Sequence, residues 1–176
     1  MESKLVFDIP EIPEGESLRE IDVPPGELDV SLDQVELEGP LHIALDLYRS
    51  GDTVRVKGEY AGDLKIICSR CLETAPARVT GRLEIYCEKR EGELDEADRQ
   101  ALEDGGVVFH DGKTLDLRDE IRQTVLLELP WNPICREACR GLCPRCGADL
   151  NRASCACRPR PADPRWADLE KILKQG

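Results

Sequence analysis

The chain has 176 residues, 40% of them hydrophobic and 4% aromatic, a length that suits one domain with a modest core and a small appended module. Its formal net charge of −12 argues against binding nucleic acid over the whole surface, because phosphate contacts require clustered lysine and arginine. No signal-peptide pattern or run of about 20 apolar residues is present, so we expect a cytoplasmic protein that does not bind a membrane.

The first ninety residues predict β structure, because apolar residues recur with a period of two between turn signals. Alternation begins at Leu41, and Ser50-Gly51-Asp52 predicts a turn into the next strand. A second turn is predicted at Ala61-Gly62-Asp63, before a strand that ends at Cys68. Further short strands are expected within residues 28–37. One face of a returning strand carries Val79, Leu83, Ile85 and Cys87, and we expect Cys87 to be a core residue.

Two helices are predicted in the second half. The acidic segment 91–106 is typical of a solvated helix or a loop. Asp116 can cap a helix over residues 117–129 that ends at Pro130, with an apolar stripe. A last helix is expected to start at Asp163-Pro164. The apolar stripe of the helix over residues 117–129 consists of Ile121, Val125, Leu126 and Leu129.

These elements predict an α+β fold. Its core is an antiparallel β-meander that is barrel-like, with a few helices and a C-terminal cysteine-rich zinc module. We divide the chain into a β-rich core domain, residues 1–130, and a module, residues 131–176. The first contains the acidic segment 91–106 and the helix 117–129, and the second contains the cysteine-rich segment and the C-terminal helix.

The nine cysteines indicate metal binding rather than disulfides, because the cytosol keeps thiols reduced and an odd number leaves one unpaired. In Cys143-Pro-Arg-Cys146-Gly147 the two-residue gap lets both thiolates reach one metal, and glycine permits the unusual backbone angles of such a knuckle. Cys155 and Cys157 can fold back to complete a site of four thiolates. Cys68-Ser-Arg-Cys71 is a second such pair, at the tip of a predicted hairpin.

Ligand counting predicts one or two structural zinc ions. In the two-site arrangement, one ion is bound by Cys143, Cys146, Cys155 and Cys157, and the other by Cys68, Cys71, Cys135 and Cys139. A single site with the other cysteines free is an alternative, as is a different exchange of partners within the cluster. Iron–sulfur clusters use other spacings. A catalytic zinc is not indicated, because the two histidines, His42 and His110, fit a strand surface and a loop.

The arginines near the cysteines have two explanations. Residues 131–165 contain seven arginines and three acids, a formal charge of +4, whereas the rest of the chain carries −16. The arginines contact RNA or a protein partner, or they neutralise thiolate charge, since zinc with four thiolates carries a formal charge of −2. The candidates for contact are Arg70, Arg140, Arg145, Arg152, Arg158 and Arg160.

Four pieces of sequence occur in order: Cys68-Ser-Arg-Cys71, the helix end Leu126-Leu-Glu-Leu-Pro130, the cysteine-rich run 139–151, and Asp163-Pro-Arg165 before an apolar stretch. Together they resemble the YceD family, the large ribosomal RNA subunit accumulation proteins, from about Leu41 to the C-terminus. The resemblance implies a bacterial-type ribosome-biogenesis factor, without a known catalytic activity, that supports accumulation and maturation of large-subunit ribosomal RNA. It implies that the partners are this precursor RNA, a basic ribosomal protein, or both.

A zinc-ribbon transcription regulator or RNA polymerase partner is the alternative function, which duplex-DNA binding by the cysteine module would support. An enzyme is not indicated, because no Ser-His-Asp set, phosphate-binding loop or dinucleotide fingerprint is found. We therefore expect no small-molecule substrate. The acidic charge slightly favours a route to ribosomal RNA through a protein partner.

Overall fold

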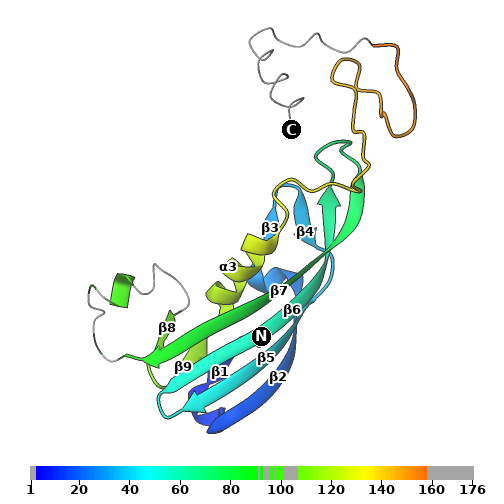
Figure 1. Cartoon of the computed structure of the whole chain (residues 1–176). Coiled ribbons are helices and arrows are strands. Elements are labelled where there is room, and N and C mark those ends of the chain that lie inside the picture. Colours follow the sequence, from blue (N-terminus) through cyan, green and yellow to red (C-terminus); the bar gives the residue numbers. More distant parts are fainter. Residues whose placement is uncertain (1–2, 91, 93–95, 97, 101–106, 158–176) are drawn as a thin grey trace, which may run out of the picture.

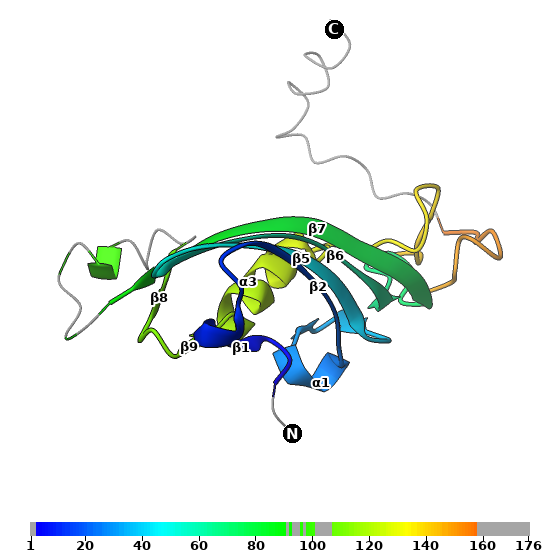
Figure 2. The same cartoon turned by 90° about the horizontal axis from the view of Figure 1, so that it is seen from below.

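The chain folds around a strongly curved sheet with a helix against its concave side, as the computed structural model shows (Figures 1 and 2). The structure describes residues 3–90, 92, 96, 98–100 and 107–157. Within them the protein is mostly β with few helices, as predicted. Among the same residues, no helix is long and apolar enough to cross a membrane.

Seven strands form this sheet within the described residues. β6 is the central strand: one edge pairs with β7 along its whole length, and the other pairs first with β5 and then with β4. β5, β6 and β7 form the predicted antiparallel meander, while β8 joins β7 in parallel. The strands are β2 (Gly15–Val23), β3 (Ser31–Leu32), β4 (Val35–Leu37), β5 (Leu41–Ser50), β6 (Thr53–Ile67), β7 (Thr74–Lys89) and β8 (Val107–His110).

The sheet does not close, so the barrel-like prediction is wrong. β2 pairs only with β5, and β8 pairs only with β7, among the residues that the structure describes. A helix covers the concave side instead, and the Tyr60 hydroxyl of β6 donates to its Thr124 carbonyl at 3.2 Å. The arch is therefore filled by packing against α3 (Arg118–Glu128), with α1 (Pro25–Leu28) and the ribbon of β1 (Val6–Asp8) and β9 (Thr114–Asp116) beside it (Figure 2).

The turn predicted at Ala61-Gly62-Asp63 is also wrong, because β6 runs straight through these residues. Ala61 pairs with His42 on one side and Thr80 on the other. A Cβ atom on Gly62 would lie 3.0 Å from side-chain atoms of Leu37 and Leu41. The glycine thus allows close packing where β4 and β5 meet against β6, rather than a change of chain direction.

The helix predicted over residues 117–129 is α3, which buries Ile121 and Val125 and ends before Pro130. The Asp116 carboxylate accepts a hydrogen bond from the Arg118 N–H at 3.0 Å, although Leu117 is the N-cap residue. Of the acidic segment 91–106 the structure describes residues 92, 96 and 98–100, and 96 and 98–100 are helical. The helix predicted from Asp163 lies outside the described residues, and the division into two domains at residue 130 stays a prediction.

Candidate metal centre

Eight cysteines lie in two groups of four at one end of the sheet. In each group the sulfur atoms all lie within 4.8 Å of one another, so each group could hold a metal ion. The structure brings together the same two sets that ligand counting proposed. We call Cys68, Cys71, Cys135 and Cys139 the clamp group, and Cys143, Cys146, Cys155 and Cys157 the knuckle group.

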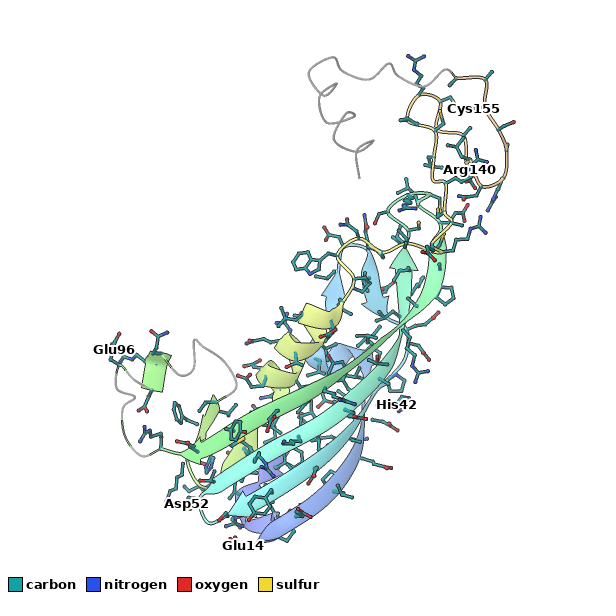
Figure 3. All side chains as sticks on the ribbon, in the orientation of Figure 1. Glu14, His42, Asp52, Glu96, Arg140 and Cys155 are labelled. Carbon is teal, nitrogen blue, oxygen red and sulfur yellow. The ribbon has the colours of Figure 1, made fainter. Side chains whose placement is uncertain are left out.

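The clamp group joins two distant parts of the chain. Cys68 and Cys71 lie in the loop between β6 and β7, whereas Cys135 and Cys139 follow α3. Pro133 brings the second segment alongside the first, since its carbonyl accepts the Ser69 N–H at 2.8 Å. Figure 3 shows Arg140 and Cys155 at this tip, while Glu14 and Asp52 lie at the far end of the sheet. The tip therefore consists of a hairpin and a returning C-terminal segment.

Sulfur distances in the clamp group match a tetrahedral zinc site. The Sγ atoms of Cys68 and Cys139 are 3.9 Å apart, and those of Cys71 and Cys135 are 3.7 Å apart. Zinc–sulfur bonds of about 2.3 Å in a tetrahedron place the sulfur atoms about 3.8 Å apart. The nine cysteines all lie in the described residues, and none of them forms a disulfide. Four thiolates at this spacing suit a structural zinc and leave no open position for a substrate.

Backbone groups stabilise one thiolate in each group. Burial opposes ionisation of Cys68, yet N–H donors from Cys135, Cys71 and Arg70 lower its pKa to about 6. The N–H groups of Arg145 and Cys146 lower the pKa of Cys143 to about 6. Such donors are the expected surroundings of a metal-bound sulfur.

Other thiols of the same groups ionise with difficulty. Burial, reinforced by neighbouring sulfur atoms, raises the pKa of Cys135 to about 12. A hydrogen bond with the Cys146 sulfur, followed by burial, raises the pKa of Cys157 to about 12. Four thiolates within one group repel each other, so their joint ionisation requires a cation among them.

The knuckle group is built on a tight turn. The Gly147 N–H donates to the Cys143 carbonyl at 2.9 Å, and the Cys143 N–H donates to the Ala148 carbonyl at 2.8 Å. Gly147 has a φ of +72°, in the left-handed region that favours glycine, as predicted for this knuckle. An isolated bridge between Leu142 and Asp149 closes the base of the turn.

Arg70 ties this turn to the hairpin. Its carbonyl accepts the Leu142 N–H at 2.9 Å, and its guanidinium donates to the Cys139 carbonyl at 3.0 Å. Gly141 has a φ of +71°, and a Cβ there would lie 2.7 Å from the Arg70 carbonyl oxygen. Gly141 is thus a contact residue that spacing of the cysteines alone did not indicate.

The candidate contact arginines fall into three sets. Arg70 serves the internal contacts above, and Arg152 pairs with Glu73 at 2.9 Å and Asp149 at 3.3 Å. The side chains of Arg140 and Arg145 are exposed and have no hydrogen-bond or ion-pair partner in the described part of the chain. Arg158 and Arg160 lie outside the described residues.

Cys87 and the two histidines lie apart from the clamp group and the knuckle group. Cys87 is in the sheet core, as expected, where burial raises its pKa to about 12. His42 is exposed on β5, hydrogen-bonded to Asp22. His110 is buried at the end of β8, so its prediction as a loop residue is wrong. Cysteine sulfur is therefore the only donor type in the candidate sites of the described residues.

Residues 56–173 match the family described as large ribosomal RNA subunit accumulation protein YceD. An uncharacterised protein of Mycobacterium tuberculosis is 32% identical over 149 residues, covering 85% of this chain and 70% of the relative. The chloroplastic large ribosomal RNA subunit accumulation protein YCED homolog 1 of Arabidopsis thaliana is 25% identical over 162 residues, 77% of this chain and 49% of the relative.

The uncharacterised protein YlbN of Bacillus subtilis is 28% identical over 117 residues, 65% of this chain and 63% of the relative. No solved structure matches the chain. The family's name describes the accumulation of an RNA rather than a catalysed reaction. From the match over residues 56–173 and the mycobacterial relative, the chain belongs to the YceD family of large ribosomal RNA subunit accumulation proteins.

Proposed function

We propose that this protein is a non-enzymatic ribosome-biogenesis factor that supports the accumulation and maturation of large-subunit ribosomal RNA. Its family membership supports the process. The observation that carries the proposed mode of action is the pair of four-cysteine groups at the tip of the sheet. The tip is the part of the protein that contacts the maturing large subunit.

Both groups bind zinc in this proposal, and both sites are structural. Each offers four thiolates, the donor set of closed structural sites, and neither includes a histidine or a carboxylate. When bound, zinc supplies a fixed crosslink. In the clamp group this crosslink holds the C-terminal segment against the β6–β7 hairpin. In the knuckle group it fixes the turn that contains Arg145 and follows Arg140.

Charge decides which partner is favoured. The chain carries −12, and each zinc with four thiolates adds a formal −2 that offsets the arginines of the tip. Attraction to phosphate is therefore weak, so we assign the main contact to a basic ribosomal protein of the precursor large subunit. Arg140 and Arg145 are the described candidates for RNA contact.

Loss of the gene tests this function directly. We expect the ratio of large-subunit to small-subunit ribosomal RNA to fall, and the wild-type protein to restore it and to co-sediment with precursor large subunits. Cys71→Ser, which removes a clamp ligand, should fail to restore the ratio. Leu18→Ala is the control, because Leu18 is exposed on β2, away from the tip.

An unchanged RNA ratio in the deletion strain, or sedimentation only as free protein, would contradict the proposal. Crosslinking in cells, followed by identification of the bound protein and RNA, separates a protein-mediated contact from a direct RNA contact. Tight binding of duplex DNA by the full chain, with a steep dependence on salt, would instead support the transcriptional alternative.

A further inference from the structure

The two cysteine groups share one short piece of chain, which the structure describes from end to end. Cys139 belongs to the clamp group, and Cys143, four positions later, belongs to the knuckle group. We infer that the two metal sites are coupled, and that Asn151 is the positioning residue through which the knuckle sets the Cys139 ligand of the clamp. The inference rests on the metal binding proposed above and adds an order of filling to it.

Asn151 contacts both the Cys139 sulfur and the residue after it. Its Nδ2 donates to Cys139 Sγ at 3.5 Å, and its Oδ1 accepts the Arg140 N–H at 2.8 Å. Asp149 orients the amide, because its Oδ1 accepts the Asn151 N–H at 2.9 Å and Nδ2 at 2.8 Å. A donor to a metal-bound sulfur fixes its direction and draws off part of its charge, so Asn151 sets both.

The knuckle turn places Asn151. The Leu150 N–H donates to the Gly141 carbonyl at 2.9 Å, and Leu142 bridges to Asp149. These bonds return the chain from Cys146 to the vicinity of Cys139. A metal bound by Cys143, Cys146, Cys155 and Cys157 constrains this segment from both sides, so a filled knuckle holds Asn151 against Cys139.

The other clamp ligands do not depend on the knuckle in this way. Cys68 and Cys71 are fixed by the β6–β7 hairpin, and Cys135 follows Pro133, which is bonded to Ser69. Arg70 of the hairpin also holds the Cys139 backbone, through the bond to its carbonyl at 3.0 Å. The Cys139 sulfur, however, is the clamp sulfur that accepts a hydrogen bond from the knuckle segment. The knuckle should therefore fill first and raise the metal affinity of the clamp, and linkage makes the effect reciprocal.

Cobalt(II) titration of the full-length, reduced, metal-free protein tests the coupling, because thiolate–cobalt absorption reports each site. Cys71→Ser leaves the knuckle as the complete site, and it should fill with the affinity of the first wild-type step. Cys146→Ser leaves the clamp as the complete site. It should fill about tenfold more weakly than the second wild-type step, the usual scale for losing support around a metal ligand.

Two substitutions separate positioning from a general loss of folding. Asn151→Ala loses all three side-chain hydrogen bonds, whereas Asn151→Asp keeps an acceptor for the Arg140 N–H and loses the donor to the Cys139 sulfur and to Asp149. Both should weaken the clamp step about tenfold, shift its charge-transfer band and leave the knuckle step within about twofold of wild type. Asn132→Ala is the control, since Asn132 is an exposed asparagine of the same segment, and it should change neither step.

Equal clamp affinity in Cys146→Ser and in the second wild-type step would overturn the coupling. Wild-type clamp binding in both Asn151 variants would overturn the role of Asn151, as would an equal loss at both sites. These outcomes differ from a failure of the proposed metal binding itself: a wild-type protein that binds no cobalt would remove that proposal, whereas two independent sites would remove the coupling alone.

Discussion

Different interactions stabilise the sheet and the cysteine tip. From residue 41 to residue 47 of β5 every second residue is buried, and Leu41, Ile43, Leu45 and Leu47 are each at most 2% exposed. Each such side chain contributes about 1.5–3 kcal/mol on burial. Between residues 131 and 157 the buried residues are Pro133, Cys139, Gly141 and Cys143. The sheet can fold on hydrophobic burial, whereas the tip buries little apolar surface, so the metal ions proposed above would supply its main stabilisation.

The two regions meet at the hairpin between β6 and β7. Cys68 is fully buried directly after β6, and Cys71 is 6% exposed. These two sulfur atoms belong to the clamp group, and their backbone lies in the loop that joins β6 to β7. Sheet folding can therefore bring together two of the four sulfur atoms of the clamp group before any metal binds.

Metal removal gives the largest expected contrast. Structural zinc contributes about 10–16 kcal/mol of apparent binding free energy in small zinc peptides, so a chelator should unfold the tip and leave the sheet folded. Alkylation followed by mass spectrometry checks this: eight cysteines should be modified, and the buried Cys87 should stay protected. Modification of Cys87 together with the others would show that the two regions unfold as one.

A cavity in the sheet core should destabilise the sheet and leave the tip unchanged. Leu47→Ala removes a fully buried side chain and should lower the free energy of unfolding by about 2–5 kcal/mol. Leu18→Ala, at a position that is 76% exposed on the neighbouring strand, should change it by less than about 0.5 kcal/mol. Urea denaturation measures both. The zinc content of the folded protein should not change in either variant.

Two glycines of the tip sharpen the contrast within the cysteine region. Gly141 and Gly147 share a φ near +70°, at +71° and +72°, so alanine costs about 1–2 kcal/mol of backbone strain at either position. Only at Gly141 does the new Cβ meet another residue, the Arg70 carbonyl, which adds about 1–3 kcal/mol.

Hydrogen exchange of the Leu142 amide reports the difference, because that N–H donates to Arg70. Protection should fall in Gly141→Ala and persist in Gly147→Ala. Equal loss in the two variants would mean that strain alone, and not the contact with Arg70, controls how the turn sits on the hairpin.

The smallest predicted effect is a loss of stability at alkaline pH, at the contact between β6 and α3. Burial, with the nearby Glu128 carboxylate, raises the pKa of Tyr60 to about 12, against about 10 in an unfolded chain. The fold favours the neutral phenol, so this contribution is complete below about pH 10 and is lost as the pH rises towards 12. Denaturation at several pH values, with Tyr60→Phe as control, measures it; an identical pH dependence in Tyr60→Phe would exclude Tyr60 as its source.

The regular strands and the cysteine sets could be predicted because their signals are local. Val79, Leu83, Ile85 and Cys87 share one buried face, as a period of two requires. The cysteine sets follow from short spacings in the chain. Gly62 was misread because glycine signals a turn, although the buried positions Tyr60, Gly62 and Leu64 continue without a break on one face.

Other features depend on tertiary contacts that leave little trace in the sequence. β2 escaped prediction because Leu18 faces solvent while Arg19 is half-buried on the inner side, so pairing with β5 rather than its own pattern defines it. The contacts of Gly141 with Arg70, and of Asn151 with Cys139, likewise depend on how distant segments are placed. Sequence spacing identified the candidate ligands but not the residues that support them.

The four cysteines of the clamp group are synthesised at two different times. Cys71 and Cys135 are 64 positions apart, and Cys68 and Cys139 are 71 apart. Because the ribosome makes the chain from its N-terminus, the first two thiols emerge long before their partners, and the proposed metal binding requires them to stay reduced meanwhile. The segment made in between includes β7 and α3, so completion of this site marks a nascent chain whose sheet and helix have already been synthesised.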